Sequence, residues 1–424
     1  MDFSFTSDQL LIRDTVRQFM ETEMRPLLRE YDRAEKFPEE QVRRLGELGC
    51  CGMLIPEEYG GSATDTVTYA LMIEEVARVC ASTAVTLSVT NSVAAAPILN
   101  HGTPAQKKKY LPRLARGEIL GGFCLTEPGA GSDAAGIRTR AVRSGDHFII
   151  SGTKSWVTNG GFSGVYVVFA RTDPAAGSRG ITAFLVEPSF PGFRVSRYED
   201  KMGLRLSRSA EIVFEDCRVP VENLLGAEGQ GLRVALGALD GGRIGIAAQS
   251  VGVAQGAYEA AVRYARQRRA FGRPIADNQA IQWMIADMAT EIEAARALTH
   301  YAASLRDIEL AREATEASSS TEGILGGRSF SSDNSSPTRG GALAPYAARS
   351  SVGPHSARAK LYASEMANRV CARAVQIHGS AGYSRETDVE RFYRDARVLT
   401  IYEGTSEMQR LVIARDLLRS RKRC

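Results

Sequence analysis

The carboxylate of Glu403 stands between the aromatic Tyr402 and the flexible Gly404, near the end of the chain. An aromatic neighbour keeps water from a carboxylate, and a glycine lets another molecule approach the backbone closely. Desolvation raises the pKa of a carboxyl group, and a raised pKa suits a general base that works near neutral pH. A solvated glutamate before a helix is the alternative, because helix N-termini favour acidic side chains.

A helix is expected to begin just after this glutamate. Ser406 and Gln409 have the spacing of a capping box. Apolar residues then recur at helical spacing, at Met408, Leu411, Val412, Leu417 and Leu418. This helix would hold Glu403 just outside its first turn.

A glycine-rich segment, Leu-Thr-Glu-Pro-Gly-Ala-Gly-Ser-Asp at residues 125–133, is a second candidate for chemistry. A nucleotide-binding glycine fingerprint needs a strand before it and a helix after it. Here residues 139–143 and the run from Phe148 have the composition of strands, so the sequence argues against a dinucleotide-binding βαβ unit. A surface turn is the alternative use of the segment.

Several charged residues on expected helices could bind a ligand. Arg268 has a planar fork that suits a diphosphate, but Arg263 and Arg266 precede it, as on a solvated helix face. Asp240 and Arg243 have the three-residue spacing of an ordinary helical ion pair. From the residue types alone, Arg268 could bind a ligand or face solvent, and Asp240 and Arg243 could bind a ligand or only each other.

Composition narrows the function classes. The 424 residues carry 53 basic and 49 acidic side chains, a balance that favours neither a nucleic-acid nor a membrane partner. No apolar run is expected to reach the roughly 18 residues that span a bilayer. The seven cysteines and five histidines show no metal or redox spacing, which predicts no metal site and reduced thiols in a cytoplasmic protein.

The periodicity predicts an α+β chain of three domains. Residues 1–119 have helical patterns, and residues 120–227 contain short β-rich runs without intervening helices, which predicts an antiparallel sheet or barrel. Residues 228–424 return to helices, expected at 232–268, 278–312, 356–379 and from Ser406, as a four-helix bundle.

Residues 314–352 do not fit that pattern. Their serine-, glycine- and proline-rich composition cannot bury enough apolar surface to offset its ordering entropy, which predicts an inserted surface loop. A partner-docking segment and an error in the gene model are the two alternatives.

From end to end, the chain resembles the acyl-CoA dehydrogenase family, most closely its short-chain, butyryl-CoA branch. Besides the segment 125–133 and the Glu403 segment, four motifs carry the resemblance. They are Gly-Thr-Lys-Ser-Trp-Val-Thr-Asn-Gly-Gly at 152–161, Asp-Lys-Met-Gly at 200–203, Leu-Asp-Gly-Gly-Arg-Ile-Gly-Ile-Ala-Ala-Gln at 239–249, and Arg-Arg-Ala-Phe-Gly at 268–272.

The resemblance implies an FAD-dependent α,β-dehydrogenation of an acyl-CoA thioester, as in fatty acid β-oxidation. Glu403 would remove the α-proton while the β-hydrogen leaves as hydride to the flavin. The backbone N–H of Glu403 and a ribityl hydroxyl would bind the thioester oxygen. Some relatives place the base on the helix that here carries Gly241 and Gly242, so the absence of a glutamate there favours Glu403.

The resemblance also implies which residues hold the ligands. FAD-binding residues would be Phe123, Leu125, Thr126, Gly131, Ser132, Trp156, Val157, Thr158, Arg268, Phe271, Gln279, Gln376, Ile377, Gly379, Thr405 and Glu407. Substrate-binding residues would be Ser132, Asp240, Arg243 and Gly404. Thr158 would donate towards flavin N5. Arg268, Phe271 and Gln279 of one subunit and the strip Gln376–Gly379 of another would meet across a subunit boundary, as in the family's homotetramer. Ser380 stands where the family usually has a second glycine, which puts the fine adenosine contacts in doubt.

The implied electron acceptor is an electron-transfer flavoprotein, and the implied substrate is a short straight-chain acyl-CoA. An oxidase or a flavin monooxygenase of the same fold is the first alternative, although monooxygenase relatives typically lack the glutamate. A non-catalytic acyl-CoA-binding protein is the second alternative.

Overall fold

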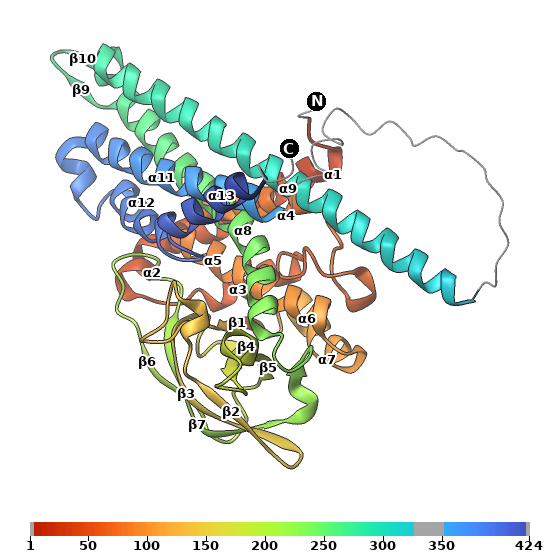
Figure 1. Cartoon of the computed structure of the whole chain (residues 1–424). Helices are drawn as coiled ribbons and strands as arrows, with labels where there is room; N and C mark the ends of the chain where they lie inside the picture. The colour runs from red at the N-terminus through yellow and green to blue at the C-terminus, as the bar shows by residue number, and fades with distance from the viewer. Residues whose placement is uncertain (1–3, 326–351, 421–424) are drawn as a thin grey trace, which may run out of the picture.

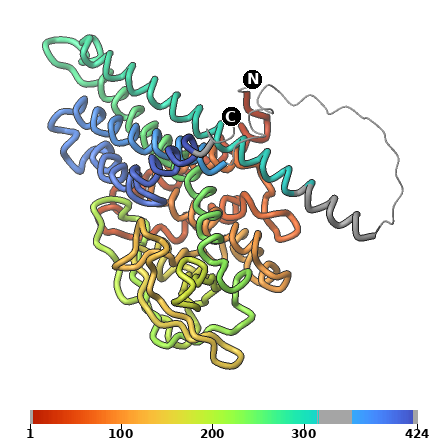
Figure 2. Tube along the Cα trace, viewed as in Figure 1, coloured from red at the N-terminus to blue at the C-terminus, as the bar shows by residue number. Residues whose placement is uncertain are grey.

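A computed structural model describes residues 4–325 and 352–420 of the chain. The chain forms helices first, then a sheet from its middle segment, and then long C-terminal helices. The sheet lies at one side of the helices (Figures 1 and 2). This order confirms the fold class that the sequence predicts.

Short helices form the first part of the chain. They are α1 (Ser7–Phe19), α2 (Leu28–Ala34), α3 (Glu39–Glu47), α4 (Thr66–Val79), α5 (Ala81–Ser88), α6 (Ala96–His101) and α7 (Pro104–Ala115), with a π-helix, η4 (Val89–Ala95), between α5 and α6. The side chains of Thr6 and Thr103 each accept a hydrogen bond from the backbone N–H of the third helical residue, Gln9 or Gln106. The side-chain oxygen of that glutamine in turn accepts a hydrogen bond from the backbone N–H of the threonine. These two capping boxes fix where α1 and α7 begin.

The middle segment forms an eight-stranded sheet with the order β6-β7-β3-β2-β4-β5-β8, in which β1 pairs with β4. The strands are β1 (Leu120–Cys124), β2 (Arg140–Ser144), β3 (His147–Thr158), β4 (Ser163–Arg171), β5 (Ile181–Val186), β6 (Phe193–Tyr198), β7 (Ser209–Pro220) and β8 (Leu224–Leu225). The strand-like residues 139–143 and the run from Phe148 correspond to β2 and to part of β3. Most pairs are antiparallel, but β1 runs parallel to β4, which the expectation of an antiparallel sheet did not include.

The C-terminal part is built on α8 (Gly231–Gln267), α9 (Gln279–Leu325), α11 (Val352–His378), α12 (Asp388–Ala396) and α13 (Ser406–Ser420). A short hairpin, β9 (Arg269–Ala270) with β10 (Arg273–Pro274), joins α8 to α9, and the 3-10 helix η9 (Gly379–Tyr383) follows α11. The helix predicted at 278–312 extends to Leu325, so residues 314–325 of the predicted loop are helical. Residues 326–351 lie outside the described residues.

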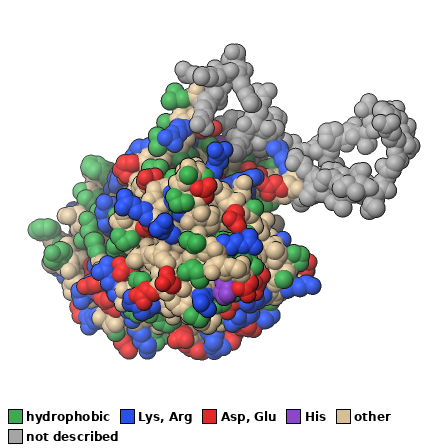
Figure 3. Space-filling view, turned by 60° about the horizontal axis from the view of Figure 1, so that its bottom comes forward, with side chains coloured by type: hydrophobic (Ala, Val, Ile, Leu, Met, Phe, Trp, Pro, Cys, Tyr) green, Lys and Arg blue, Asp and Glu red, His purple; other side chains and the backbone are tan. Residues whose placement is uncertain are grey.

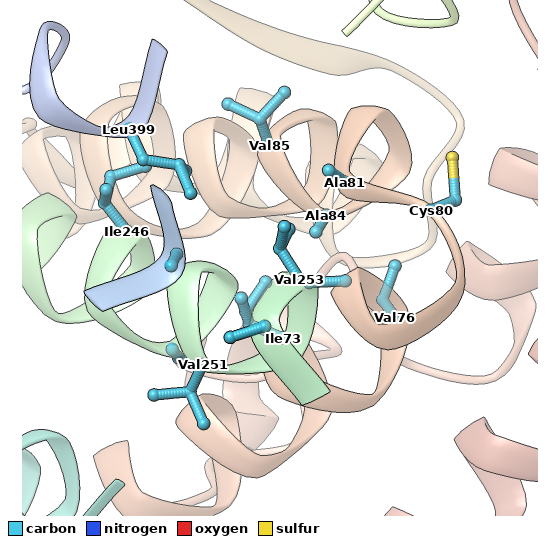
Figure 4. Packing of buried hydrophobic residues seen from close by; sticks show 14 of the residues in the cluster. Ile73, Val76, Cys80, Ala81, Ala84, Val85, Ile246, Val251, Val253 and Leu399 are labelled. Atoms are coloured by element: carbon cyan, nitrogen blue, oxygen red, sulfur yellow. The ribbon is translucent and has the colours of Figure 1, made fainter. Parts of the chain in front are cut away.

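The main core lies where α4 and α5 pack on α8. Small and β-branched side chains such as Ile73, Ala84 and Val253 interdigitate there (Figure 4). Glycines let the helices approach: a Cβ on Gly252 would lie 2.2 Å from the Glu74 carbonyl oxygen, and one on Gly256 would lie 2.3 Å from that of Arg78.

One stretch, Ala81–His101, is long and apolar enough to cross a membrane by length and composition, which corrects the expectation that no run reaches that limit. In the protein, 89% of its most apolar window is buried, as in a core helix. On the face shown in Figure 3, acidic and basic side chains are interspersed. Among residues 4–325 and 352–420, no three His, Cys, Asp or Glu side chains are placed to share a metal ion.

Candidate active site

Glu403 lies in a tight left-handed turn between 3-10 helix η10 (Arg397–Thr400) and α13. Its φ is 53° and that of Gly404 is 89°, so two successive residues adopt the left-handed region. The turn points the carboxylate at α8, where a Cβ on Gly242 would lie 2.5 Å from Oε2. A glycine at position 242 therefore makes the space that the carboxylate fills.

The carboxylate is sealed from solvent at one oxygen although the residue as a whole is half-buried. Oε2 of Glu403 finds no hydrogen-bond partner among the described residues. Burial raises the pKa of Glu403 to about 7, and the positive charges of Arg243 and Lys360 act in the opposite direction. An unsatisfied buried carboxylate with a pKa near neutrality has the properties of a general base.

Hydrogen bonds on both sides hold the turn. Before it, the Tyr402 hydroxyl donates to Gln249 on α8. After it, Lys360 Nζ on α11 donates to the Gly404 carbonyl oxygen at 2.8 Å, and Gln409 Nε2 donates to the same oxygen at 2.9 Å. The base is thus fixed by contacts to three helices.

The predicted capping box at the start of α13 is wrong. Ser406 Oγ is buried without a partner among the described residues. Thr405 instead caps the helix, since its Oγ1 accepts from Met408 N at 3.3 Å. The Gln409 amide is drawn away from the helix backbone because it bonds the carbonyls of Glu403 and Gly404.

Asp240 and Arg243 form the helical ion pair that their spacing allows, with 2.5 Å between Asp240 Oδ1 and Arg243 Nη1. Arg243 is 9% exposed, and its charge is one of the two that lower the pKa of Glu403. Burial raises the pKa of Asp240. Asp240 and Arg243 thus form an ordinary ion pair on α8, and the charge of Arg243 also acts on Glu403. An ion pair at this position therefore does not exclude a role in the site.

The start of the glycine-rich segment lies along β3. Ser155 N donates to the Thr126 carbonyl at 2.9 Å, and the buried Lys154 Nζ donates to the Leu125 carbonyl at 3.1 Å. Lys154 also pairs with buried Glu127 at 2.8 Å. Leu125 and Thr126 are therefore brought beside the strand that carries Trp156, Val157 and Thr158, as the resemblance implies.

This part of the surface presents an aromatic face and open backbone. Trp156 has a φ of 60° and is 59% exposed, whereas Val157 is buried and Thr158 is half-buried. Gly131 and Ser132 are exposed, and no atom lies within 4 Å of a Cβ on Gly131. Phe123 on β1 is half-buried against Phe169.

The other predicted cofactor residues gather at the far end of the C-terminal helices, away from the sheet (Figure 1). Tyr264 near the end of α8 stacks on His378 at the end of α11, with ring centroids 4.2 Å apart. Arg268, Phe271, Gln279, Gln376 and Gly379 are exposed at this end. A single chain does not bring these residues to Trp156 and Thr158.

Three of the predicted FAD-binding residues lie where the structure gives their side chains another position or role. Ile377 is 3% exposed and packs in the main core, so its side chain does not face a ligand. Thr405 caps α13. Glu407 is exposed in the first turn of α13.

Lys360 is a site residue that sequence reasoning missed. It is fully buried on α11 and touches the turn that holds Glu403. A signal was present, because Lys360 shares a helix face with Ala357, Ala363 and Ala367, all buried. A lysine on a buried helix face needs a partner there, but the sequence does not say which.

A methyl group at position 242 is expected to displace the base. Gly242→Ala should lower kcat by about tenfold or more, since a misplacement of 1 Å can cost about 100-fold. Gly241→Ala is the matched control, because no atom lies within 4 Å of a Cβ there. Steady-state kinetics of both variants test this, and equal rates would contradict the contact.

Comparison with known proteins places the chain in a family. Models of the acyl-CoA dehydrogenase N-terminal, middle and C-terminal domains match residues 6–118, 122–217, and 229–330 with 342–418. The chain belongs to the acyl-CoA dehydrogenases, which are oxidoreductases that act on CH–CH groups. The unmatched residues 331–341 are fewer than the insertion predicted at 314–352.

The chain is similar over its full length to curated relatives. It is 42% identical to the short-chain specific acyl-CoA dehydrogenase of Clostridium acetobutylicum, covering 99% of this chain and 100% of that protein. It is also 42% identical to the acryloyl-CoA reductase (NADH) of Anaerotignum propionicum, covering 99% and 96%. Both similarities extend through the Glu403 segment.

Solved structures have the same fold. Butyryl-CoA dehydrogenase from Megasphaera elsdenii superposes with a TM-score of 0.87 at 40% identity, covering 99% of this chain and 100% of that one. A chain from work on the electron transferring flavoprotein of Acidaminococcus fermentans gives 0.88 at 43%, covering 99% and 100%. An acyl-CoA dehydrogenase complexed with FAD from Bacillus anthracis gives 0.86 at 34%, covering 98% and 69%.

Proposed function

We propose that this enzyme dehydrogenates a short-chain acyl-CoA thioester to the trans-2-enoyl thioester, with Glu403 as the base. The observation that carries the proposal is the buried, unpartnered Oε2 of Glu403, whose pKa is raised to about 7. A carboxylate in that state can take a proton from carbon near neutral pH, because burial disfavours its charge more than Arg243 and Lys360 favour it.

The chain's own residues account for the proton transfer. Glu403 accepts the α-proton at its carboxylate, and the left-handed turn presents its backbone N–H as a donor for the thioester oxygen. Gly404 has no side chain to keep the thioester from the backbone. Arg243 and Lys360 keep part of the Glu403 population ionised against the effect of burial.

FAD is the cofactor, and the residues beside β3 fit it. Exposed Trp156 offers a ring face, Thr126, Ser132 and Thr158 offer hydroxyls, and the backbone at Gly131 is open. When bound, FAD accepts the hydrogen lost from the β-carbon. Asp240 and Arg243 would then lie on the substrate side of the helix that supports the base.

A short acyl chain is favoured by the two relatives whose names specify it, the short-chain dehydrogenase and butyryl-CoA dehydrogenase. Val93 supports the same choice, because its Cγ1 lies 3.2 Å from a Cβ built on Gly242, beside the carboxylate. A β-branched side chain at that point narrows the space next to the base.

The proposed assembly is a homotetramer that passes electrons to an electron-transfer flavoprotein in the cytoplasm. Phe271 is 100% exposed and Tyr383 is 89% exposed, at the same end as Arg268 and Gln376. Such aromatic exposure favours a contact with another copy of the chain. The six described cysteines are free and buried, as expected of a reducing compartment.

Anaerobic titration with butyryl-, octanoyl- and isobutyryl-CoA tests the proposal. We expect butyryl-CoA to bleach the oxidised flavin band most completely, since the space beside Glu403 is narrow. A yellow protein that none of the three bleaches would contradict the dehydrogenation. Preferential bleaching by octanoyl-CoA would contradict the chain length but not the chemistry.

The acryloyl-CoA reductase relative suggests the reverse direction as a second candidate. A carboxyl group with a pKa near 7 can return a proton as readily as remove it. Mixing the photoreduced protein with acryloyl-CoA tests this direction. Fast reoxidation, together with slow bleaching by saturated thioesters, would favour the reductase.

A further inference from the structure

The turn that carries Glu403 has an unfavourable backbone conformation. A non-glycine residue in the left-handed region is uncommon, and here Gly404 follows it in the same region. Such a conformation persists only where surrounding contacts impose it. The contacts after Glu403 come from Lys360 and Gln409, which share the Gly404 carbonyl oxygen.

Burial of the Lys360 ammonium beside this turn costs free energy. Lys360 is fully buried on α11, and burial lowers its pKa to about 8, whereas the charge of Glu403 acts to raise it. A buried ammonium needs a partner. Its recorded hydrogen bond is to the Gly404 carbonyl rather than to a carboxylate.

We propose that Lys360 is a positioning residue for Glu403: its ammonium locks the Glu403–Gly404 turn against α11 and favours the ionised carboxylate beside Gly242. The inference rests on the proposed role of Glu403 as the base. The inference goes beyond that role because it assigns the orientation and the ionisation of Glu403 to Lys360, a side chain that does not touch the reacting atoms.

Two positive charges lower the pKa of Glu403, that of Arg243 more strongly and that of Lys360 next. From α8 comes Arg243, which already bonds Asp240. From α4 comes Tyr69, and burial raises its pKa to about 12. Burial also raises the pKa of Tyr402, and both tyrosines therefore stay neutral near pH 7. Glu365 and Glu407 act on Lys360 and raise its pKa.

The sign of the effect follows from these charges. A positive charge near a carboxylate lowers its pKa, so the loss of Lys360 raises that of Glu403. A base works only when deprotonated. The acid limb of kcat/KM, which reports the free enzyme, should therefore lie near pH 7 in the wild type and higher without Lys360.

The test is the pH profile of kcat/KM for Lys360→Met, measured on the FAD-loaded protein with the acyl-CoA that bleaches the wild type. We expect the acid limb to move up by about one pH unit. We expect kcat above the limb to fall by about tenfold or more, because the turn is less well oriented. Lys360→Arg should return the limb to within a few tenths of the wild-type position.

Two further variants separate charge from packing. Gln409→Leu removes a neutral donor to the same carbonyl, so kcat should fall while the limb stays in place. Arg369→Met removes a positive charge from the same helix, where Arg369 pairs with Glu291, and should change neither quantity.

A limb that stays at the wild-type position in folded Lys360→Met overturns the assignment, whatever happens to kcat, because a merely structural lysine would behave in that way. If Lys360→Met does not fold, the same test is made with Lys360→Gln, by the position of the acid limb of its kcat/KM profile. Failure of the proposed function would look different, since the wild type itself would then not be bleached by any acyl-CoA.

Discussion

Replacement of Glu403 by glutamine is expected to lower turnover by about 100- to 10,000-fold, the usual contribution of a general base. The amide has nearly the shape of the carboxylate but cannot accept the α-proton. FAD and acyl-CoA binding should be retained, because the backbone N–H of the turn is unchanged. Stopped-flow bleaching of the flavin band under anaerobic conditions measures the loss.

Glu58→Gln is the control for that variant. Glu58 is exposed and lies outside the residues assigned to FAD or to the substrate, so its replacement should leave turnover near the wild-type value. Normal activity in Glu403→Gln would remove Glu403 as the base. Loss of the yellow colour instead would indicate that the turn helps to hold the cofactor.

The Glu403→Gln variant should also be more stable than the wild type above pH 7. The folded-state pKa of Glu403, about 7, lies above the ordinary value of 4.5, so the folded protein binds more protons than the unfolded chain between these values. Stability from this group is therefore lost as the pH rises through that window. Urea melts of both proteins at pH 5 and pH 8 should show a much larger difference in stability at pH 8, because most of the window lies above pH 5.

Removal of the Glu127 carboxylate is expected to cause the largest loss of stability, about 3–5 kcal/mol. Lys154 is fully buried, and Glu127→Ala leaves its ammonium without an anion. The substitution also strips acceptors from the backbone N–H groups of Arg138 and Thr139, which bond the carboxylate at 2.6 and 2.9 Å. Urea denaturation, followed by circular dichroism and flavin release, measures the effect.

The double variant Glu127→Leu with Lys154→Met should recover much of that loss, because it removes both buried charges together. Glu118→Ala is the surface control: Glu118 pairs with Arg116 in the open, and its loss should not move the denaturation midpoint. A midpoint for Glu127→Ala equal to that of the control would contradict the buried pair.

Local patterns in the sequence predicted much of the fold. The run from Phe148 became part of β3 because β-branched and aromatic residues suit a pleated surface. The helix expected at 232–268 from its apolar periodicity became α8, with nearly the same bounds. The parallel pairing of β1 with β4 could not be read in this way, since strand partners are chosen by contacts that are distant along the chain.

The site shows the same division between local and distant information. Glu403 could be found because Tyr402 and Gly404 adjoin it. Lys360 could not be assigned to the site, because it lies 43 positions before Glu403 in the chain. The Ser406–Gln409 spacing predicted a capping box, but the Gln409 amide satisfies the carbonyls of the turn instead.

The glycines of α8 have a consequence for how this sequence can evolve. A side chain at Gly242 would meet the base, one at Gly245 would meet the hydroxyls of Tyr69 and Ser88, and one at Gly252 or Gly256 would meet α4. Substitutions at these positions are limited by volume rather than by polarity. A neutral drift experiment should thus fix changes at Gly237 and Gly241, where a Cβ meets nothing within 4 Å, long before the other four positions change.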